Sequence, residues 1–179
     1  MYVSVVDARS ANILGAWLLL AADSLGATTE QAAGHRGALA ATLVVLRQEP
    51  GIGIDRLGAT LRVSQPAAVR LVNQLVEAGL ARRGAGGPDG RRTSVRLTAA
   101  GTRAAGAVLK SRQRAIEDLL SGLSPAERDQ LARLAEKACV AGIDGWLHAQ
   151  QVCRLCDIVS CPPASCPVDA AGGPAPSTP

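Results

Sequence analysis

Apolar residues recur three and four positions apart along most of this chain, and that spacing predicts a mainly α-helical protein. The exception is the stretch 80–98. There Val95 and Leu97 alternate with polar residues after a glycine-rich turn, a pattern typical of a two-stranded hairpin. The predicted helices cover about 10–26, 34–48, 54–61, 65–78, 99–120 and 124–149.

Two short helices directly before the hairpin carry clear boundary signals. Ser64 can cap the second of them by accepting a hydrogen bond from a free backbone N–H, and Pro66 fits its first turn, where no N–H is needed. Gly79 suits the position just beyond its last turn. The order of elements therefore predicts a helix-turn-helix over 54–79, followed by a wing over 80–98.

The second helix of this pair has one apolar and one polar face. Amide side chains can pair with adenine in the DNA major groove, and arginine can pair with guanine. An ordinary solvated helix shows a similar pattern, so the helix alone leaves both interpretations open. Its candidate base-contacting residues are Gln65, Arg70, Asn73 and Gln74.

The predicted wing carries four arginines. Arg82 and Arg83 lie on its first arm, and Arg91 and Arg92 follow its tip. A thin hairpin has little core for them to serve, so they are candidates for contact with DNA phosphates or with the minor groove. A solvated loop is the alternative, and the helix-turn-helix immediately upstream favours DNA.

Positive charge is concentrated on this unit. The chain of 179 residues has a formal net charge of +4, yet the stretch from Arg62 to Arg114 holds eleven basic and two acidic residues and carries +9. A localised basic surface is typical of a nucleic-acid interface. Aromatic residues are only 2% of the chain, which argues against single-stranded nucleic acid as the main target.

The stretch 57–101 resembles the multiple-antibiotic-resistance regulator (MarR) family. The resemblance implies a homodimer that binds a palindromic operator in double-stranded DNA, usually as a repressor. It places Ser64, Gln65, Pro66 and Arg70 against DNA, and Arg91 at the wing tip. The chain departs from the family at Gly53, where a Ser or Thr is usual, so we expect a weaker cap there. The matching residues are Leu57-Gly58-Ala59, Arg62-Val63-Ser64-Gln65-Pro66, Val69-Arg70-Leu71-Val72, Leu75, Glu77-Ala78-Gly79-Leu80, Arg82, Asp89-Gly90-Arg91 and Val95-Arg96-Leu97-Thr98-Ala99-Ala100-Gly101.

The fold class expected from pattern and resemblance is mainly α. It consists of a winged helix-turn-helix with a two-stranded wing and with N- and C-terminal dimerisation helices at 10–26 and 99–149. The apolar run 13–22 is too short to span a membrane, and a secretory signal is a weaker alternative because its leading segment has mixed charge. We therefore expect a cytoplasmic homodimer without a membrane partner. Packing of these helices within one chain is the alternative.

Four of the five cysteines lie close together near the C-terminus, with the spacing Cys-x2-Cys-x4-Cys-x4-Cys. Four thiolates can hold an iron–sulfur cluster or a tetrahedral zinc ion. The compact run that ends in Cys-Pro favours an iron–sulfur cluster, with zinc as the alternative and free or disulfide-forming thiols as a third possibility. The candidate ligands are Cys153, Cys156, Cys161 and Cys166.

The remaining cysteine, Cys139, is expected to be a buried structural residue of the last helix, because a free cysteine often behaves as a small hydrophobic side chain. His148 precedes the cysteine-rich segment 150–169 and is a possible ligand or hydrogen-bond donor to it. The low-complexity end, 170–179, is expected to be disordered.

No catalytic residues stand out, because the chain lacks a Ser/His/Asp order, a phosphate-binding glycine loop and paired carboxylates. We therefore expect a regulator and not an enzyme. Its DNA binding would respond to the cysteine-ligated cofactor. The alternative is a MarR-like regulator of the same fold that responds to a small organic ligand and keeps the cysteines as a structural zinc site. An iron–sulfur electron carrier or enzyme is a third possibility, which the basic segment argues against.

Overall fold

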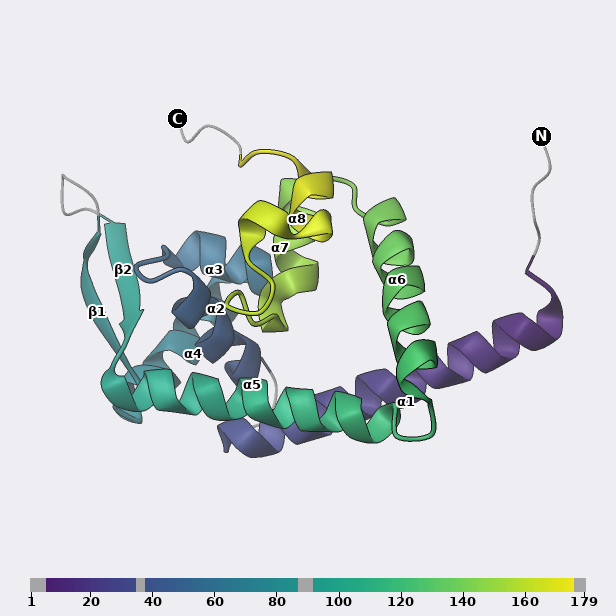
Figure 1. Ribbon diagram of the computed structural model, residues 1–179. Helices are drawn as coiled ribbons and strands as arrows, with labels where there is room; N and C mark the ends of the chain where they lie inside the picture. Colours follow the sequence, from purple (N-terminus) through teal and green to yellow (C-terminus); the bar gives the residue numbers. More distant parts are fainter. Residues whose placement is uncertain (1–5, 35–37, 87–91, 176–179) are drawn as a thin grey trace.

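The structure is a computed structural model that describes residues 6–34, 38–86 and 92–175, and it is mainly helical with one two-stranded sheet (Figure 1). The predicted architecture, mainly α with one two-stranded antiparallel sheet, is thereby confirmed. The elements are α1 (Ala8–Ala33), α2 (Leu39–Gln48), α3 (Ile54–Leu61), α4 (Gln65–Glu77), β1 (Ala81–Gly86), β2 (Arg92–Leu97), α5 (Ala99–Leu119), α6 (Pro125–Ala141), α7 (Trp146–Val152), η1 (Cys153–Leu155), η2 (Pro163–Ser165) and α8 (Pro167–Gly172).

The hydrophobic core is centred on α2, in which every residue from Leu39 to Leu46 is buried. Helix α3 adds Leu57, α4 adds Val72 and Leu75, and the other core residues come from the wing and from α5. A helix that is apolar on all sides must be surrounded by other elements. The surrounding elements are α1, α3, α4, the wing, α5 and η1, so that α2 holds the helix-turn-helix to the rest of the chain.

The caps of the helix-turn-helix follow the sequence signals. The Ser64 hydroxyl accepts a hydrogen bond from the Ala67 N–H and begins α4, and Gly79 has φ +68° just beyond the end of that helix. Gly53 precedes α3 and provides no side-chain cap, as expected, and Arg62 follows its last residue in a left-handed conformation with φ +57°. Arg62 is the one non-glycine residue with positive φ among residues 6–34, 38–86 and 92–175.

The wing is an antiparallel pair in which Ala81 lies opposite Leu97 and Arg82 lies opposite Arg96. The α2–α3 loop extends this sheet, because the Gly51 N–H donates to the Val95 carbonyl and the Val95 N–H donates to the Ile52 carbonyl. The wing is therefore fixed to the loop that leads into α3, which holds the wing and the helix-turn-helix as one unit.

Helix α1 is longer than the predicted 10–26 and crosses α5, with which it packs. It ends at Gly34, which has φ +70°, so the predicted second helix begins at Leu39 and not at Gly34; residues 35–37 lie outside the described residues. Several of its large apolar side chains are exposed, among them Leu18 (59%) and Leu19 (68%). By length and composition alone α1 could cross a membrane, a test that core helices and signal sequences also pass.

The predicted last helix, 124–149, is divided in the structure. The capping box of Ser124 and Glu127 forms as expected, but α6 ends at Ala141, and α7 begins only after Gly145, which has φ +144°. The sequence signals for this break were Gly142 and the Asp144-Gly145 dipeptide. Helix α6 contacts α8, and none of its side chains is buried (Figure 1).

Residues 146–172, called the C-terminal segment below, fold back onto α2 and α3. Helix α7, η1, η2 and α8 follow one another in this segment, with α8 packed on α7. A Cβ added at Gly172 would lie 2.7 Å from the Ala149 Cβ. The expectation of disorder from residue 170 is thus wrong for 170–172, which belong to α8, because packing on α7 orders a sequence of low complexity. Residues 176–179 lie outside the described residues.

Candidate nucleic-acid interface and cysteine cluster

Helix α4 presents a polar surface on the side opposite the core. Ala68, Val72 and Leu75 are buried, whereas Arg70 and Gln74 are exposed. Ser64, Gln65 and Pro66 are also exposed at its N-terminus, and Asn73 is half-buried. The polar face that the sequence predicted therefore exists. It is continuous from the helix start to its last turn and has the width of a single helix, which a major groove can admit.

Two side-chain contacts fix the ends of this face. Gln65 Nε2 donates to Asp55 Oδ1 over 2.9 Å and ties the start of α4 to α3. Arg83 donates from Nη2 to Asn73 Oδ1 over 2.7 Å and ties the wing to α4. Because Asn73 and Arg83 are bound to each other, they connect α4 to the wing, and Arg70 and Gln74 remain exposed on α4.

The wing places arginines on both of its faces. Arg82 and Arg83 are adjacent in β1 and exposed, so their side chains leave opposite faces of the hairpin. Arg92 begins β2, whereas Arg91 lies outside the described residues. The predicted DNA contact of Arg91 at the wing tip therefore lies outside the described residues.

Arg96 is a candidate that the sequence analysis passed over. The strand register places it directly opposite Arg82, and its guanidinium lies beside Gly51, 3.1 Å from where a Cβ would stand. Like charges directly opposite each other destabilise a hairpin. An anion that binds between them would offset that repulsion. The signal was available in the sequence, since alternation of side chains on β2 follows from counting the hairpin register.

The four C-terminal cysteines are brought together around one cavity of about 290 Å³. Cys166 is buried, Cys153 and Cys156 are half-buried, and Cys161 is exposed. The cavity is also lined by Gln48, Arg56 and Thr60 of α2 and α3. The thiols therefore lie directly against the helix-turn-helix and do not form a separate domain.

Contacts among these thiols shift their acidities in opposite directions. The Cys153–Cys156 hydrogen bond raises the pKa of Cys153 above its usual range and lowers that of Cys156 to about 6. The Arg112 charge also lowers the pKa of Cys156. A hydrogen bond with Cys166 raises the pKa of Cys161. The four thiols thus form one interacting group in which Cys156 is the most acidic of the three shifted thiols.

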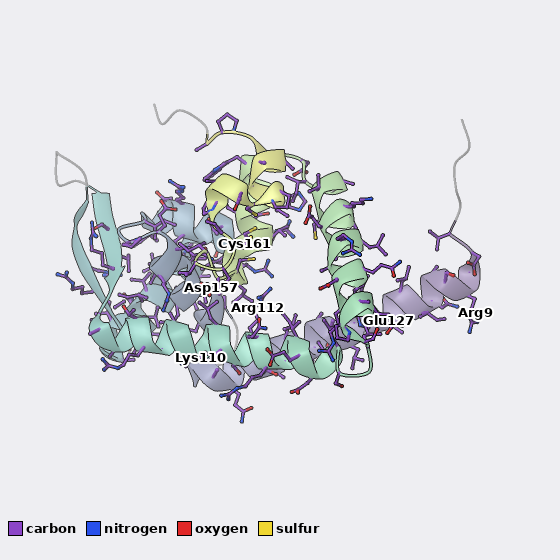
Figure 2. All side chains as sticks on the ribbon, viewed as in Figure 1. Arg9, Lys110, Arg112, Glu127, Asp157 and Cys161 are labelled. Atoms are coloured by element: carbon purple, nitrogen blue, oxygen red, sulfur yellow. The ribbon has the colours of Figure 1, made fainter. Side chains whose placement is uncertain are left out.

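A wider cleft of about 1410 Å³ lies between α5, α6 and the C-terminal segment and is lined by all five cysteines. Figure 2 shows Arg112 on α5 close to Asp157 and Cys161 of the C-terminal segment. The basic side chains of the cleft are Arg47, Arg103, Lys110 and Arg112, and its acidic ones are Glu136 and Asp157. The net positive charge of this wall would stabilise thiolates.

The cluster offers the residue type that ligates an iron–sulfur cluster or zinc, because four cysteines line one cavity, but their sulfur atoms are not arranged as the ligands of a metal ion. Among the described residues, no three His, Cys, Asp or Glu side chains stand in an arrangement that could hold a metal ion. The cluster is thus a set of converging thiols, and Cys153, Cys156, Cys161 and Cys166 would be the residues to hold such a group.

Cys139 and His148 lie outside the cavity that the four C-terminal cysteines share. Cys139 was expected to be buried, but it is exposed on α6 and lines the wide cleft, because the contacts of α6 within the described chain bury none of its side chains. His148 lines a separate cavity of about 540 Å³ together with Arg62 and Gln151. Its Nδ1 lies 2.7 Å from Asp144 Oδ1, so the imidazole is directed at a carboxylate of the preceding turn.

The contacts that attach the C-terminal segment to the helix-turn-helix were not foreseen. Gln48 Nε2 of α2 donates to the carbonyls of Cys153 (3.2 Å) and Cys156 (2.7 Å). The Arg56 guanidinium of α3 stacks 4.7 Å from the centre of the Trp146 ring. These contacts join residues about a hundred positions apart, so no local pattern announces them.

Parts of this chain are similar in sequence to known proteins. Residues 40–92 match the model of the MarR family. The chain is 32% identical over 95 residues to a proposed transcriptional regulatory protein for the hcr operon of Thauera aromatica. That alignment covers 53% of this chain and 57% of the relative, so the chain spans little more than half of the relative's length.

Solved structures show the same fold over most of the chain. RV1404 from Mycobacterium tuberculosis superposes with a TM-score of 0.66 at 23% identity, covering 80% of this chain and 100% of that protein. A mutant of MepR from S. aureus, bound to an oligodeoxyribonucleotide, superposes with a TM-score of 0.55 at 20% identity, covering 73% of this chain and 96% of that protein. The part that these likenesses leave uncovered is large enough to include the C-terminal segment.

Proposed function

We propose that this chain is a transcription regulator of the MarR family that binds double-stranded DNA through α4 and the wing. The observation that carries the proposal is the exposed Arg70 and Gln74 face of α4, joined to the arginine-bearing wing through the bond between Arg83 and Asn73. In this arrangement α4 enters the major groove, and the wing follows the adjacent backbone. MepR, of the same fold, is bound to an oligodeoxyribonucleotide.

The proposal includes a homodimer that acts as a repressor on a palindromic operator. Its support is the pair of helices α1 and α6, which keep large apolar side chains exposed: Leu18, Leu19 and Leu134 are all more than half exposed. Contiguous exposed apolar surface is characteristic of an interface. A two-fold dimer would place two copies of α4 on successive major grooves, about one helical turn apart.

The experiment that tests DNA binding is a selection from fragmented genomic DNA on the purified full-length chain, followed by titration of the retained fragment at several salt concentrations. We expect a palindromic fragment and an affinity that falls steeply with salt, because arginine–phosphate contacts release counterions. Retention of no fragment above background, or an affinity insensitive to salt, would contradict the proposal.

The signal that we propose acts at the cysteine cluster. Cys153, Cys156, Cys161 and Cys166 would hold an iron–sulfur cluster, which would supply a redox-responsive centre when bound. The residues of the chain provide four sulfur donors facing one cavity, with Arg112 beside them to compensate negative charge. Zinc in the same place, with a small organic ligand as the signal, is the alternative.

Anaerobic purification should therefore yield a protein that contains iron and acid-labile sulfide and absorbs visible light. Replacing Cys153 and Cys156 together with serine should abolish both, because two of four ligands are lost, whereas Cys139→Ser should retain them. One zinc per chain and no colour would favour the structural zinc site. If the protein binds DNA but contains neither iron nor zinc, the proposal of a bound metal group is refuted, and oxidation of the thiols remains as the signal.

A further inference from the structure

We infer that Gln151 couples the cysteine cluster to the helix-turn-helix, by holding the turn between α3 and α4 in the conformation that binds DNA. This inference rests on the proposed DNA-binding function and names the residue through which that function is regulated. In it, the C-terminal segment is a support for the turn, and a change at the cysteines acts on DNA binding within the same chain.

The geometry at Gln151 is that of a bridge. Its Nε2 donates to the Ala59 carbonyl over 2.9 Å, and its Oε1 accepts from Arg62 Nε over 2.7 Å. One side chain of α7 therefore holds both the last turn of α3 and the residue that ends it. Both functions of the amide are used, and Gln151 is half-buried. Its bond to the Ala59 carbonyl is partly buried, so water competes less well for that bond, whereas the bond to the Arg62 side chain is exposed.

The residue that Gln151 holds is under conformational strain. Arg62 has φ +57°, a region that costs a non-glycine residue about 1 kcal/mol or more unless its surroundings stabilise it. Two residues later Ser64 begins α4 and accepts from the Ala67 N–H. The conformation of Arg62 therefore sets the direction in which α4 leaves the turn, and the bond from Gln151 favours one direction.

Gln151 is also connected to the cysteine cluster through the backbone and through one hydrogen bond. Cys153 follows Gln151 by two residues, and the Arg154 guanidinium donates back to the Gln151 carbonyl. The carbonyls of Cys153 and Cys156 are in turn held by Gln48 of α2. A rearrangement of the cysteine cluster that moves the backbone of Cys153 or Cys156 would therefore either break the bonds to Gln48 or move the end of α7 on which Gln151 stands.

Other contacts of the C-terminal segment reach α3 at different points. Arg56 stacks on Trp146 near the start of α3 and also pairs with Glu49 over 2.9 Å, so it anchors the segment without touching the turn. Among the hydrogen bonds of the described residues, those of Gln151 are the ones that join the C-terminal segment to residues 59–62. Gln151 is therefore a positioning residue, which acts on DNA through Arg62.

The test is a cycle of four full-length proteins: wild type, Gln151→Ala, the double variant Cys153→Ser with Cys156→Ser, and the triple variant. The double variant should bind operator DNA about 5- to 150-fold more weakly than wild type, the range usual for coupling between sites. In the Gln151→Ala background the same cysteine substitutions should change affinity less than about twofold. Equal effects in both backgrounds would overturn the inference.

A readout without DNA separates this inference from the proposed function. In hydrogen–deuterium exchange, peptides over residues 54–64 should lose protection on cysteine substitution in the wild-type background, and should already be unprotected with Gln151→Ala. If the chain binds no DNA at all, the proposed function fails, and this exchange pattern still decides whether Gln151 couples the cysteines to the turn. Unchanged protection in both backgrounds overturns the coupling.

Two further variants guard against a merely structural effect. Gln151→Glu keeps the acceptor for Arg62 and loses the donor to Ala59, so it should retain part of the coupling that Gln151→Ala loses. Gln130→Ala, at an exposed glutamine of α6, is the matched control and should leave the effect of the cysteine substitutions as large as in wild type. A control that abolishes the effect as fully as Gln151→Ala would show that glutamine loss acts non-specifically.

Discussion

Replacing Arg70 with alanine should weaken binding to the operator by roughly 5- to 150-fold for each half-site, the value of one good arginine–guanine pair. Arg70 is exposed on α4, on the side opposite the buried Ala68 and Val72. Its removal leaves a base edge without a partner in the major groove and leaves the core untouched. A gel-shift titration at fixed salt, with the selected fragment and with a scrambled fragment of the same length, measures the effect.

The pattern of loss identifies the kind of contact. Arg70→Ala should lower affinity for the operator far more than for the scrambled fragment, since a base contact carries sequence information. Arg114→Ala, which removes the same charge from an exposed position near the far end of α5, should lower both affinities slightly and equally. An operator affinity unchanged by Arg70→Ala would show that α4 does not dock through this face.

Replacing Gly101 with alanine should destabilise the fold by about 3 kcal/mol, the upper part of the range for overpacking a core. A Cβ at Gly101 would lie 1.9 Å from the Leu80 carbonyl oxygen and 3.1 Å from Leu97 Cδ2. The obstructing atom belongs to the backbone, and that carbonyl also accepts from the Thr98 N–H. The start of α5 would therefore have to move away from the base of the wing.

A matched control lies in the same helix. At Gly106 a Cβ would meet Arg47 Nη1 at 3.4 Å, the mobile end of a long side chain. Gly106→Ala should therefore stabilise the protein by about 0.5–1 kcal/mol, the usual gain from removing glycine inside a helix. Urea unfolding of both variants at one protein concentration measures the two changes. Equal stability of Gly101→Ala and wild type would mean that α5 does not approach Leu80 this closely.

Much of the winged helix-turn-helix could be predicted from sequence because its determinants are local. Ser64 and Gly79 bound α4 by rules that involve only neighbouring residues, and Thr98 caps α5 in the same way. The buried face of α4 follows from helical spacing alone. The exposed face that carries Arg70 and Gln74 is then the remainder, so the candidate DNA contacts were accessible before any tertiary information.

The C-terminal part was predicted less well because its structure depends on distant partners. Gly145 breaks the last helix, and the short helices beyond it are ordered by packing on α2 and α3. Exposed Cys139 was misjudged because burial of α6 depends on an element that residues 6–34, 38–86 and 92–175 of one chain do not supply. The low complexity of the chain end predicted disorder, and it gave no sign that Gly172 packs closely on Ala149.

By itself, then, the sequence determined the order of helices and wing, the caps, the basic surface and the presence of four thiols in one short segment. Those properties depend on residue types at short spacing. Tertiary structure alone decided that the thiols lie against α2 and α3, and that Gln151 bridges Ala59 and Arg62. Such contacts join positions distant in the chain, and they arise only when packing brings those positions together.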